Sequence, residues 1–185
     1  MRRLRRTYGL SADDGVARAV YEHLGTGVPQ YVQSFFARLR DYVRMHDRNR
    51  ITLDDVAEVY RTELLGPSGQ NDLAHHEARL RDGLGDEHRY GLAMEILAES
   101  AIQGTFTTEA RRQLEKRHSK LVEDAPRQVT DTLAVLVHDE YIEPHPDGHR
   151  FIMKLLRDWW KARFRHHYRP LVENRAVGFR ESDAP

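Results

Sequence analysis

The amino-acid sequence predicts a mostly α-helical fold that contains one short β-hairpin. Apolar residues recur three or four positions apart over most of the chain, for example at Phe35, Leu39 and Val43, which is the spacing of one helix face. Strand-like residues gather around a single tight-turn dipeptide, Asp147-Gly148, because glycine supplies the positive φ that such turns need. Strand is therefore expected only beside this turn.

The composition excludes several classes of protein. The chain has 185 residues, of which 39% are hydrophobic, enough for one domain or two small ones. Lys+Arg and Asp+Glu both count 29, so the net charge does not indicate a polyanionic partner. The absence of cysteine excludes disulfides and thiolate zinc sites. No apolar run is long enough for a membrane span or a signal peptide, so we expect a cytoplasmic protein without a membrane partner.

Residues 1–84 are predicted to form a small helical bundle. The expected helices cover residues 12–23, 30–46, 53–65 and 71–84. Ser11 and Thr52 are predicted helix caps, since their side-chain oxygens can accept a free backbone N–H. Leu53 is expected on the inward face of the third helix. Residues 66–69, Gly-Pro-Ser-Gly, are expected to form the turn that ends it.

Residues 85–169 are predicted to form a winged helix-turn-helix with a two-stranded wing. Helical patterns over residues 87–101, 107–116 and 127–138 come first. A strand at residues 141–143, the Asp147-Gly148 turn, a strand at 150–153 and an apolar helix with Trp159 and Trp160 follow. Residues 170–185 contain few apolar side chains and are expected to form a flexible tail, as is the basic segment 1–6 at the start.

Three segments resemble a known family. They are residues 24–33 (LGTGVPQYVQ), residues 51–56 (ITLDDV) and residues 141–160. In this order they resemble the C-terminal lid plus winged-helix region of AAA+/STAND P-loop ATPases, especially the archaeal-ATPase-like branch. The resemblance implies an AAA+ lid-like bundle whose Gly-x-Pro turn lies near a bound nucleotide, with Gly27, Pro29 and Tyr31 as nucleotide-side contacts.

The phosphate-binding core of such ATPases is missing from the sequence. No Gly-x-x-x-x-Gly-Lys-Ser/Thr loop occurs, and no apolar strand ends in paired acids that could hold Mg²⁺. Gln30 and Tyr31 follow Pro29, where the family usually places an arginine. We therefore expect no enzyme and no cofactor in this chain, which would be a fragment, a split product or a module. ATP and Mg²⁺ are implied only where a P-loop core is present in cis or in trans.

Basic residues of the winged helix are the candidates for nucleic-acid contact. The set is Arg127, Thr130, Arg150, Lys154, Arg157 and Lys161. Winged helices contact phosphates through such a wing and helix, whereas Asp131, Asp139 and Glu140 oppose DNA. A protein partner is the favoured interpretation, and DNA stays open.

Other patterns have simpler interpretations beside the functional ones. Neighbouring histidines on a helix, His75-His76 and His166-His167, point about 100° apart and cannot share a metal ion. Residues 25–27, Gly-Thr-Gly, follow a helix, so a helix end is favoured over a phosphate loop. Trp159-Trp160 could stack on bases but is more typical of a core.

The sequence thus supports two functional hypotheses. The first is a non-catalytic lid and winged-helix module of an AAA+/STAND-like ATPase that mediates regulatory, protein or nucleic-acid contacts. The alternative is a free-standing winged-helix transcriptional regulator that binds DNA and uses residues 1–84 as a dimerisation or ligand domain. The sequence offers no dimer seam, which is why the alternative ranks second.

Overall fold

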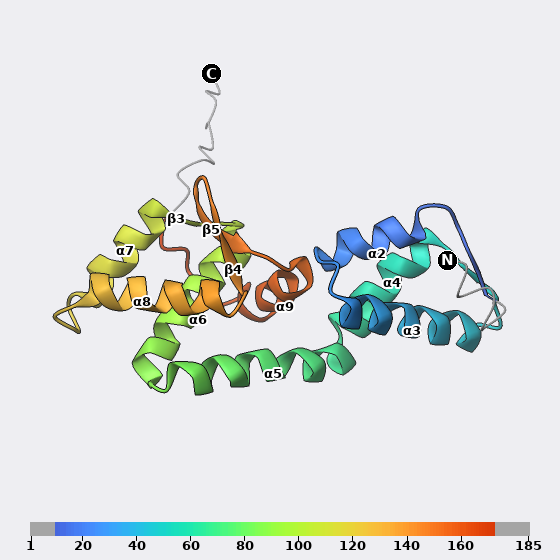
Figure 1. Cartoon of the computed structure of the whole chain (residues 1–185), viewed down its shortest axis with the longest axis horizontal. Helices are drawn as coiled ribbons and strands as arrows, with labels where there is room; N and C mark the ends of the chain where they lie inside the picture. The colour runs from blue at the N-terminus through green and yellow to red at the C-terminus, as the bar shows by residue number, and fades with distance from the viewer. Residues whose placement is uncertain (1–9, 173–185) are drawn as a thin grey trace, which may run out of the picture.

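The computed structural model describes residues 10–172, apart from the side chains of Ser68 and Asp72. These residues form eight α-helices, one π-helical segment and five short strands. The molecule is elongated, with helices α2 to α4 at one end, helices α6 to α9 with a small sheet at the other, and the long helix α5 running from the bundle along the C-terminal end (Figure 1). The predicted basic start and all but residues 170–172 of the predicted flexible tail lie outside the described residues.

The N-terminal end is a bundle of three helices, α2 (Val16–Leu24), α3 (Pro29–Met45) and α4 (Leu53–Val59). Two two-residue strands, β1 (Ser11–Ala12) and β2 (Arg50–Ile51), pair in parallel beside it. The prediction that Ser11 caps α2 is wrong, because Ser11 lies in β1, where its backbone N–H and its hydroxyl both donate to the Asn49 carbonyl. The helix begins instead after Gly15, whose φ of +91° is left-handed.

Helix α4 begins as predicted. The Thr52 side chain accepts a hydrogen bond from the Asp55 backbone, and the Asp55 carboxylate accepts one from the Thr52 backbone, which completes a capping box. Arg48 holds the same carboxylate in an ion pair at 2.5 Å. Leu53, expected on the inward face, is 49% exposed and lies over Gly15 at the end of the bundle. That expectation is wrong, because the bundle ends before its first turn can be covered.

An irregular segment joins the bundle to the long helix. The π-helix η1 (Tyr60–Leu64) continues α4, and α5 (Pro67–Leu84) follows after two residues. The turn predicted at residues 66–69 is therefore shorter than expected, because Pro67 lacks an N–H and starts α5 directly. A Cβ on Gly66 would lie 1.9 Å from the Thr62 carbonyl oxygen, so this sharp connection requires glycine.

The C-terminal end combines four helices with a three-stranded antiparallel sheet. The elements are α6 (Glu87–Gln103), β3 (Phe106–Thr107), α7 (Thr108–His118), α8 (Ala125–His138), β4 (Ile142–His145), β5 (Gly148–Phe151) and α9 (Lys154–Phe164). The strand order is β3-β5-β4, so the expected hairpin is confirmed and β3 is an addition. Gly148 has a φ of +145°, and a Cβ there would lie 2.1 Å from the Phe106 carbonyl oxygen. The β3–β5 pairing therefore needs glycine at this position.

One hydrophobic core runs through both ends of the molecule. It includes Phe35 and Leu39 of the bundle and Leu92 and Trp160 of the C-terminal end, all fully buried. Helix α9 lies between the two ends and packs on α6 and α2 (Figure 1). The two segments 1–84 and 85–169 therefore share an apolar contact. Among the described residues, no helix has the length and apolar character required to cross a bilayer.

Candidate functional site

The predicted nucleotide-side residues lie at the start of α3. Helix α3 begins at Pro29. Proline is tolerated at the first position of a helix because the N–H that it lacks would have no partner within the helix. Gly27 and Pro29 are exposed, whereas Tyr31 is half-buried and turns toward α5. Its hydroxyl is hydrogen-bonded to His76 Nε2 at 2.6 Å. The structure thus places Gly27 and Pro29 at the surface and separates them from Tyr31, which is an inter-helix contact.

His76 is the centre of a small aromatic cluster at this point. The Tyr141 hydroxyl donates a hydrogen bond to the His76 carbonyl, and the Tyr141 ring packs edge-on against both His76 and Trp160. Burial, with lesser effects from His75 and Arg79, lowers the pKa of His76 to about 4. Burial also raises the pKa of Tyr31 and brings that of Tyr141 to about 12. All three side chains are therefore neutral at neutral pH.

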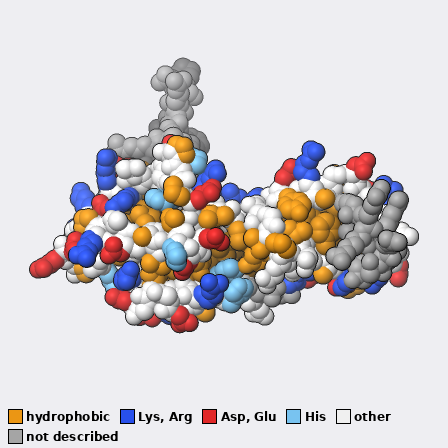
Figure 2. Space-filling model, in the orientation of Figure 1, with side chains coloured by type: hydrophobic (Ala, Val, Ile, Leu, Met, Phe, Trp, Pro, Cys, Tyr) orange, Lys and Arg blue, Asp and Glu red, His pale blue; other side chains and the backbone are white. Residues whose placement is uncertain are grey.

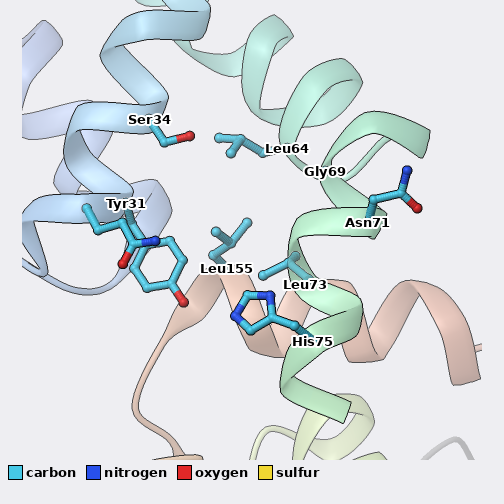
Figure 3. Close-up of a pocket in the computed structure, with 9 residues that line it drawn as sticks. Tyr31, Ser34, Leu64, Gly69, Asn71, Leu73, His75 and Leu155 are labelled. Atoms are coloured by element: carbon cyan, nitrogen blue, oxygen red, sulfur yellow. The ribbon is translucent and has the colours of Figure 1, made fainter. Parts of the chain in front are cut away.

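A cavity of about 450 Å³ opens beside Tyr31, between α3, η1, α5 and α9 (Figure 3). Its apolar lining comes from three buried leucines, Leu64, Leu73 and Leu155. Its remaining lining is polar or backbone and consists of Gln30, Tyr31, Ser34, Gly69, Asn71 and His75. None of the described lining residues is an aspartate, glutamate, lysine or arginine. The sequence analysis missed this cavity, because its residues come from four separate elements.

Lys154 and Arg157, expected to contact nucleic acid, instead surround a carboxylate at the joint between the two ends. Lys154 Nζ lies 3.1 Å and Arg157 Nη2 2.8 Å from the two Asp158 oxygens. The Tyr60 hydroxyl donates to Asp158 at 2.9 Å, and Lys154 Nζ lies 4.8 Å from the centre of the Tyr60 ring. We name Tyr60, Lys154, Arg157 and Asp158 the joint cluster. Its cations are only about one-third exposed.

Burial and pairing oppose each other in the joint cluster. Burial raises the pKa of the Asp158 carboxyl, but hydrogen bonds from Arg157, Tyr60 and Lys154 outweigh it and leave the pKa below its usual value. Burial and the Asp158 charge both raise the pKa of Tyr60. Burial and the Lys154 charge lower the pKa of His23, whose ring packs 4.5 Å from that of Tyr60. The cluster is thus ionised at Asp158 and neutral at Tyr60.

The other four candidate nucleic-acid residues are exposed on three different elements. Arg127 on α8 lies 3.9 Å from both Asp124 and Asp131. Thr130 accepts a hydrogen bond from Arg111 and donates one to the Pro126 carbonyl. These contacts keep the cation and the hydroxyl close to the α8 surface.

The remaining two candidates differ in their pairing. Arg150 on β5 pairs with Glu143 of the neighbouring strand at 2.9 Å. Lys161 on α9 is exposed and forms no ion pair with any described residue. The six predicted residues therefore do not form one surface, since Lys154 and Arg157 belong to the joint cluster.

A second hollow, of about 410 Å³, lies where α7, the start of α8 and the sheet meet. Its polar lining includes Arg111, Arg112, His149 and the hydroxyls of Thr107 and Thr108. Burial, followed by the Arg111 charge, lowers the pKa of His149. The sequence analysis missed Arg111 and Arg112, because their i,i+3 and i,i+4 acids, Glu109 and Glu115, make α7 look like an ordinary solvated helix.

Metal chemistry has no obvious place in the described structure. Within residues 10–172, no three His, Asp or Glu side chains come together in a group that could hold an ion. His75 and His76 have ring centres 4.2 Å apart, but the His76 nitrogen is already bonded to Tyr31. Comparisons with family models, curated proteins and solved structures found no match to this chain. The residues themselves are therefore the basis for a functional proposal.

Proposed function

We propose that residues 87–164 fold as a winged helix and that the whole chain is a non-catalytic lid and winged-helix module. The order α6, β3, α7, α8, β4, β5, α9 with the sheet order β3-β5-β4 supports the first part. The module acts on a P-loop ATPase core supplied in cis or in trans. ATP and Mg²⁺ belong to that core.

The joint between the two ends is the observation that carries this proposal. A Cβ on Gly25, at the end of α2, would lie 2.6 Å from the Lys154 backbone nitrogen, so the start of α9 sits directly on the bundle. The joint cluster adds a hydrogen bond from Tyr60 to Asp158 across 98 residues of sequence. A lid fastened in this way passes any movement on to the winged helix, as a regulatory module requires.

Protein contact fits the winged helix better than DNA contact. Arg127 faces Asp124 and Asp131, and Arg150 faces Glu143. Phosphate binding would have to displace these carboxylates, which reduces the gain from counterion release. The favoured partner of the winged helix is therefore another protein surface, within the ATPase or beyond it.

The proposal is tested with the ATPase core that it requires. The DNA upstream of the Met1 codon and the neighbouring genes are read for a P-loop, and the encoded core is purified with and without this chain. We expect the chain to change ATP turnover several-fold. Tyr31→Ala should weaken that effect, while Leu121→Ala, at an exposed apolar residue between α7 and α8, should not. Absence of any P-loop sequence there, or an ATP turnover by the core that is the same with and without this chain, contradicts the proposal.

The isolated chain provides the matching negative control. Titration calorimetry with ATP and Mg²⁺ should show no binding tighter than about 1 mM, because ATP affinity comes mainly from a glycine-rich phosphate loop, its lysine and Mg²⁺. Submillimolar binding, or ATP hydrolysis that persists through repurification, would show that this chain has a nucleotide site of its own.

DNA binding is the second candidate function, and the second hollow is the observation that favours it. Arg111, Arg112 and His149 line it beside α8 and the hairpin, together with Glu115. The two arginines pair with Glu115 and Glu109, so phosphate would have to displace these carboxylates as well. Affinity for a duplex of about 20 base pairs, which is about two turns, is measured across salt concentrations. Phosphate contact predicts a steep negative slope that falls by about one in Arg112→Ala. Arg61→Ala, at an exposed arginine of η1, is the control. A flat response excludes this function.

A further inference from the structure

A segment without helix or strand, residues 165–172, follows α9 and returns to α6. It is held there at two points by the side chain of Glu99. The Tyr168 hydroxyl and the Leu171 backbone N–H donate to the same oxygen, Glu99 Oε2, at 2.9 and 3.0 Å. We name residues 165–172 the strap.

Glu99 is a buried carboxylate without a neighbouring cation. It is 2% exposed and forms no ion pair with any lysine, arginine or histidine among residues 10–172, since Arg117 and His118 pair with Glu95 instead. Burying a carboxylate costs free energy unless hydrogen bonds replace its hydration. Both hydrogen bonds that it accepts from the described residues come from the strap. Glu99 therefore depends on the strap or on a segment that brings the same donors.

Two residues of the strap face the protein, and two do not. Burial, followed by the Glu99 charge, raises the pKa of Tyr168, so its hydroxyl keeps its proton and donates. Leu171, predicted to lie in a flexible tail, is instead buried and belongs to the hydrophobic core. Between them, Arg169 is exposed and Pro170 is half-buried. The groove on α6 thus accepts an aromatic hydroxyl followed three residues later by an apolar side chain.

The strap leaves space beside it. A hollow of about 240 Å³ lies between Leu171 and the end of α7, where it is lined by Gln113, Lys116, Arg117 and Lys120. Lys and Arg side chains lie over α7 at this end of the molecule (Figure 2). A different segment seated in the groove can extend into this hollow and gain contacts that the strap does not make.

We propose that the strap occupies a docking site for a protein partner and is displaced by a partner segment with the same pattern, a tyrosine followed three residues later by an apolar side chain. The partner takes over both hydrogen bonds to Glu99, so the buried carboxylate is satisfied in either state. The strap is tethered at an effective concentration on the order of 1 mM, so it closes the site until a tighter partner arrives. The site needs neither an ATPase core nor a nucleotide and goes beyond the function proposed above.

Hydrogen exchange on the full chain measures how firmly the strap is held. Tyr168→Phe removes one of the two donors, so the Leu171 amide should exchange at least about threefold faster. The amide of Leu97, inside α6, should be unaffected, because the opening is local. Tyr90→Phe removes another tyrosine hydroxyl that donates to a carboxylate, that of Glu77, and should leave the Leu171 rate unchanged.

A synthetic peptide of residues 165–172 (RHHYRPLV) is the probe for the docking site. Leu171→Asp places a charge at a buried position of the strap and should release it. We expect the peptide to bind this variant with a dissociation constant of about 1 mM or below and to shift the NMR signals of residues 95–102 and 113–120. The wild-type chain, whose site is occupied, should bind the peptide at least about tenfold more weakly.

A control variant and a control peptide show whether the pattern matters. Arg169→Asp makes the same acidic change at an exposed strap residue and should keep the site closed to the peptide. The peptide carrying Tyr168→Phe should bind Leu171→Asp at least about threefold more weakly than the unchanged peptide, through the lost hydrogen bond.

Several results would overturn the proposal. They are a dissociation constant for Leu171→Asp well above about 1 mM, equal peptide binding by Leu171→Asp and the wild-type chain, or equal binding of the two peptides. An unchanged Leu171 exchange rate in Tyr168→Phe would overturn it independently, even if Leu171→Asp does not fold. Since no nucleotide and no core domain takes part, failure of the ATPase proposal leaves these results unaffected.

Discussion

Asp158 lies where η1 and α9 meet. It accepts a hydrogen bond from Tyr60 of η1 and pairs with Lys154 and Arg157 of its own helix, while only 18% of its side chain is exposed. A half-buried carboxylate with three donors stays ionised, because the donors outweigh the cost of burial. The two ends of the molecule are therefore joined by a charge as well as by apolar packing.

The first prediction follows from the charge on Asp158. Asp158→Asn should lower the free energy of unfolding at pH 7 by about 2 kcal/mol, since it leaves Lys154 and Arg157 without a counter-charge. The folded pKa of Asp158 is lowered, so its contribution is present above about pH 4 and is lost as the pH falls through the folded pKa. Urea unfolding should therefore show a large difference at pH 7 that narrows near pH 3.

A matched variant controls for the loss of a carboxylate as such. Asp82→Asn makes the same change at an exposed position on α5 and should alter the free energy of unfolding by less than about 0.5 kcal/mol. An Asp158→Asn effect of the same size at both pH values would show that charge does not hold the joint.

The second prediction concerns His76. Its pKa is lowered from 6.5 to about 4, so the unfolded chain takes up the proton first as the pH falls. The stability that His76 contributes is therefore present above pH 6.5 and is lost between pH 6.5 and about 4. NMR titration of the His76 ring should give a midpoint near 4. His76→Gln should flatten the pH dependence of unfolding in that window, and a midpoint near 6.5 would contradict the buried, neutral ring.

At the scale of an element, the end of α2 controls how α9 docks. Gly25 and Gly85 both end a helix with a left-handed φ, at +70° and +62°. Replacing either with alanine costs about 1 kcal/mol for the strained backbone. Only Gly25→Ala also drives a Cβ into the Lys154 backbone, whereas Gly85 has nothing within 4 Å. Gly25→Ala should therefore destabilise the protein by at least about 2 kcal/mol more than Gly85→Ala.

Thermal unfolding of the two glycine variants measures this difference directly. The cost of placing alanine at a left-handed φ is about the same in both variants, so the difference between their stabilities measures the contact between α2 and α9. Equal melting temperatures would mean that the bundle can move away from α9 without a loss of stability.

The elements that local sequence could predict are those with local causes. The cap at Thr52 depends on Asp55, three residues away, and the two strands of the hairpin flank the Asp147-Gly148 turn, so both could be predicted from local sequence. Ser11 was misread because its backbone pairs with Asn49, 38 residues away. Strand β3 was missed because a segment of two residues is too short to show the alternating pattern of a strand, and it is a strand only through its pairing with β5.

The same distinction applies to the candidate site. A row of basic residues from Arg150 to Lys161 looked like one phosphate-binding surface, yet Lys154 and Arg157 are turned to Asp158 and Tyr60. Nothing local marks Tyr60, 98 residues earlier, as their neighbour. The cavity beside Tyr31 was likewise out of reach, because its lining joins residues 30–34 with residues 64–75 and Leu155.

For the whole molecule, the shared core predicts that both ends unfold together. Buried side chains run without interruption from α2 to α9, and the joint cluster adds polar contacts across the same boundary. Scanning calorimetry should therefore show a single transition whose calorimetric and van't Hoff enthalpies agree. Two separate transitions, one for residues 1–84 and one for residues 85–169, would show that the ends are independent domains.

Helix α5 has 18 residues and is therefore about 27 Å long. It lies along one side of the C-terminal end and packs on η1, α6 and α9 (Figure 1). Gly85, where an added Cβ would meet nothing within 4 Å, is the residue at which α5 ends before α6. A change in the angle between α5 and α6 at Gly85 would therefore move α5 relative to α3 and α9, and would alter the width of the cavity that these helices line.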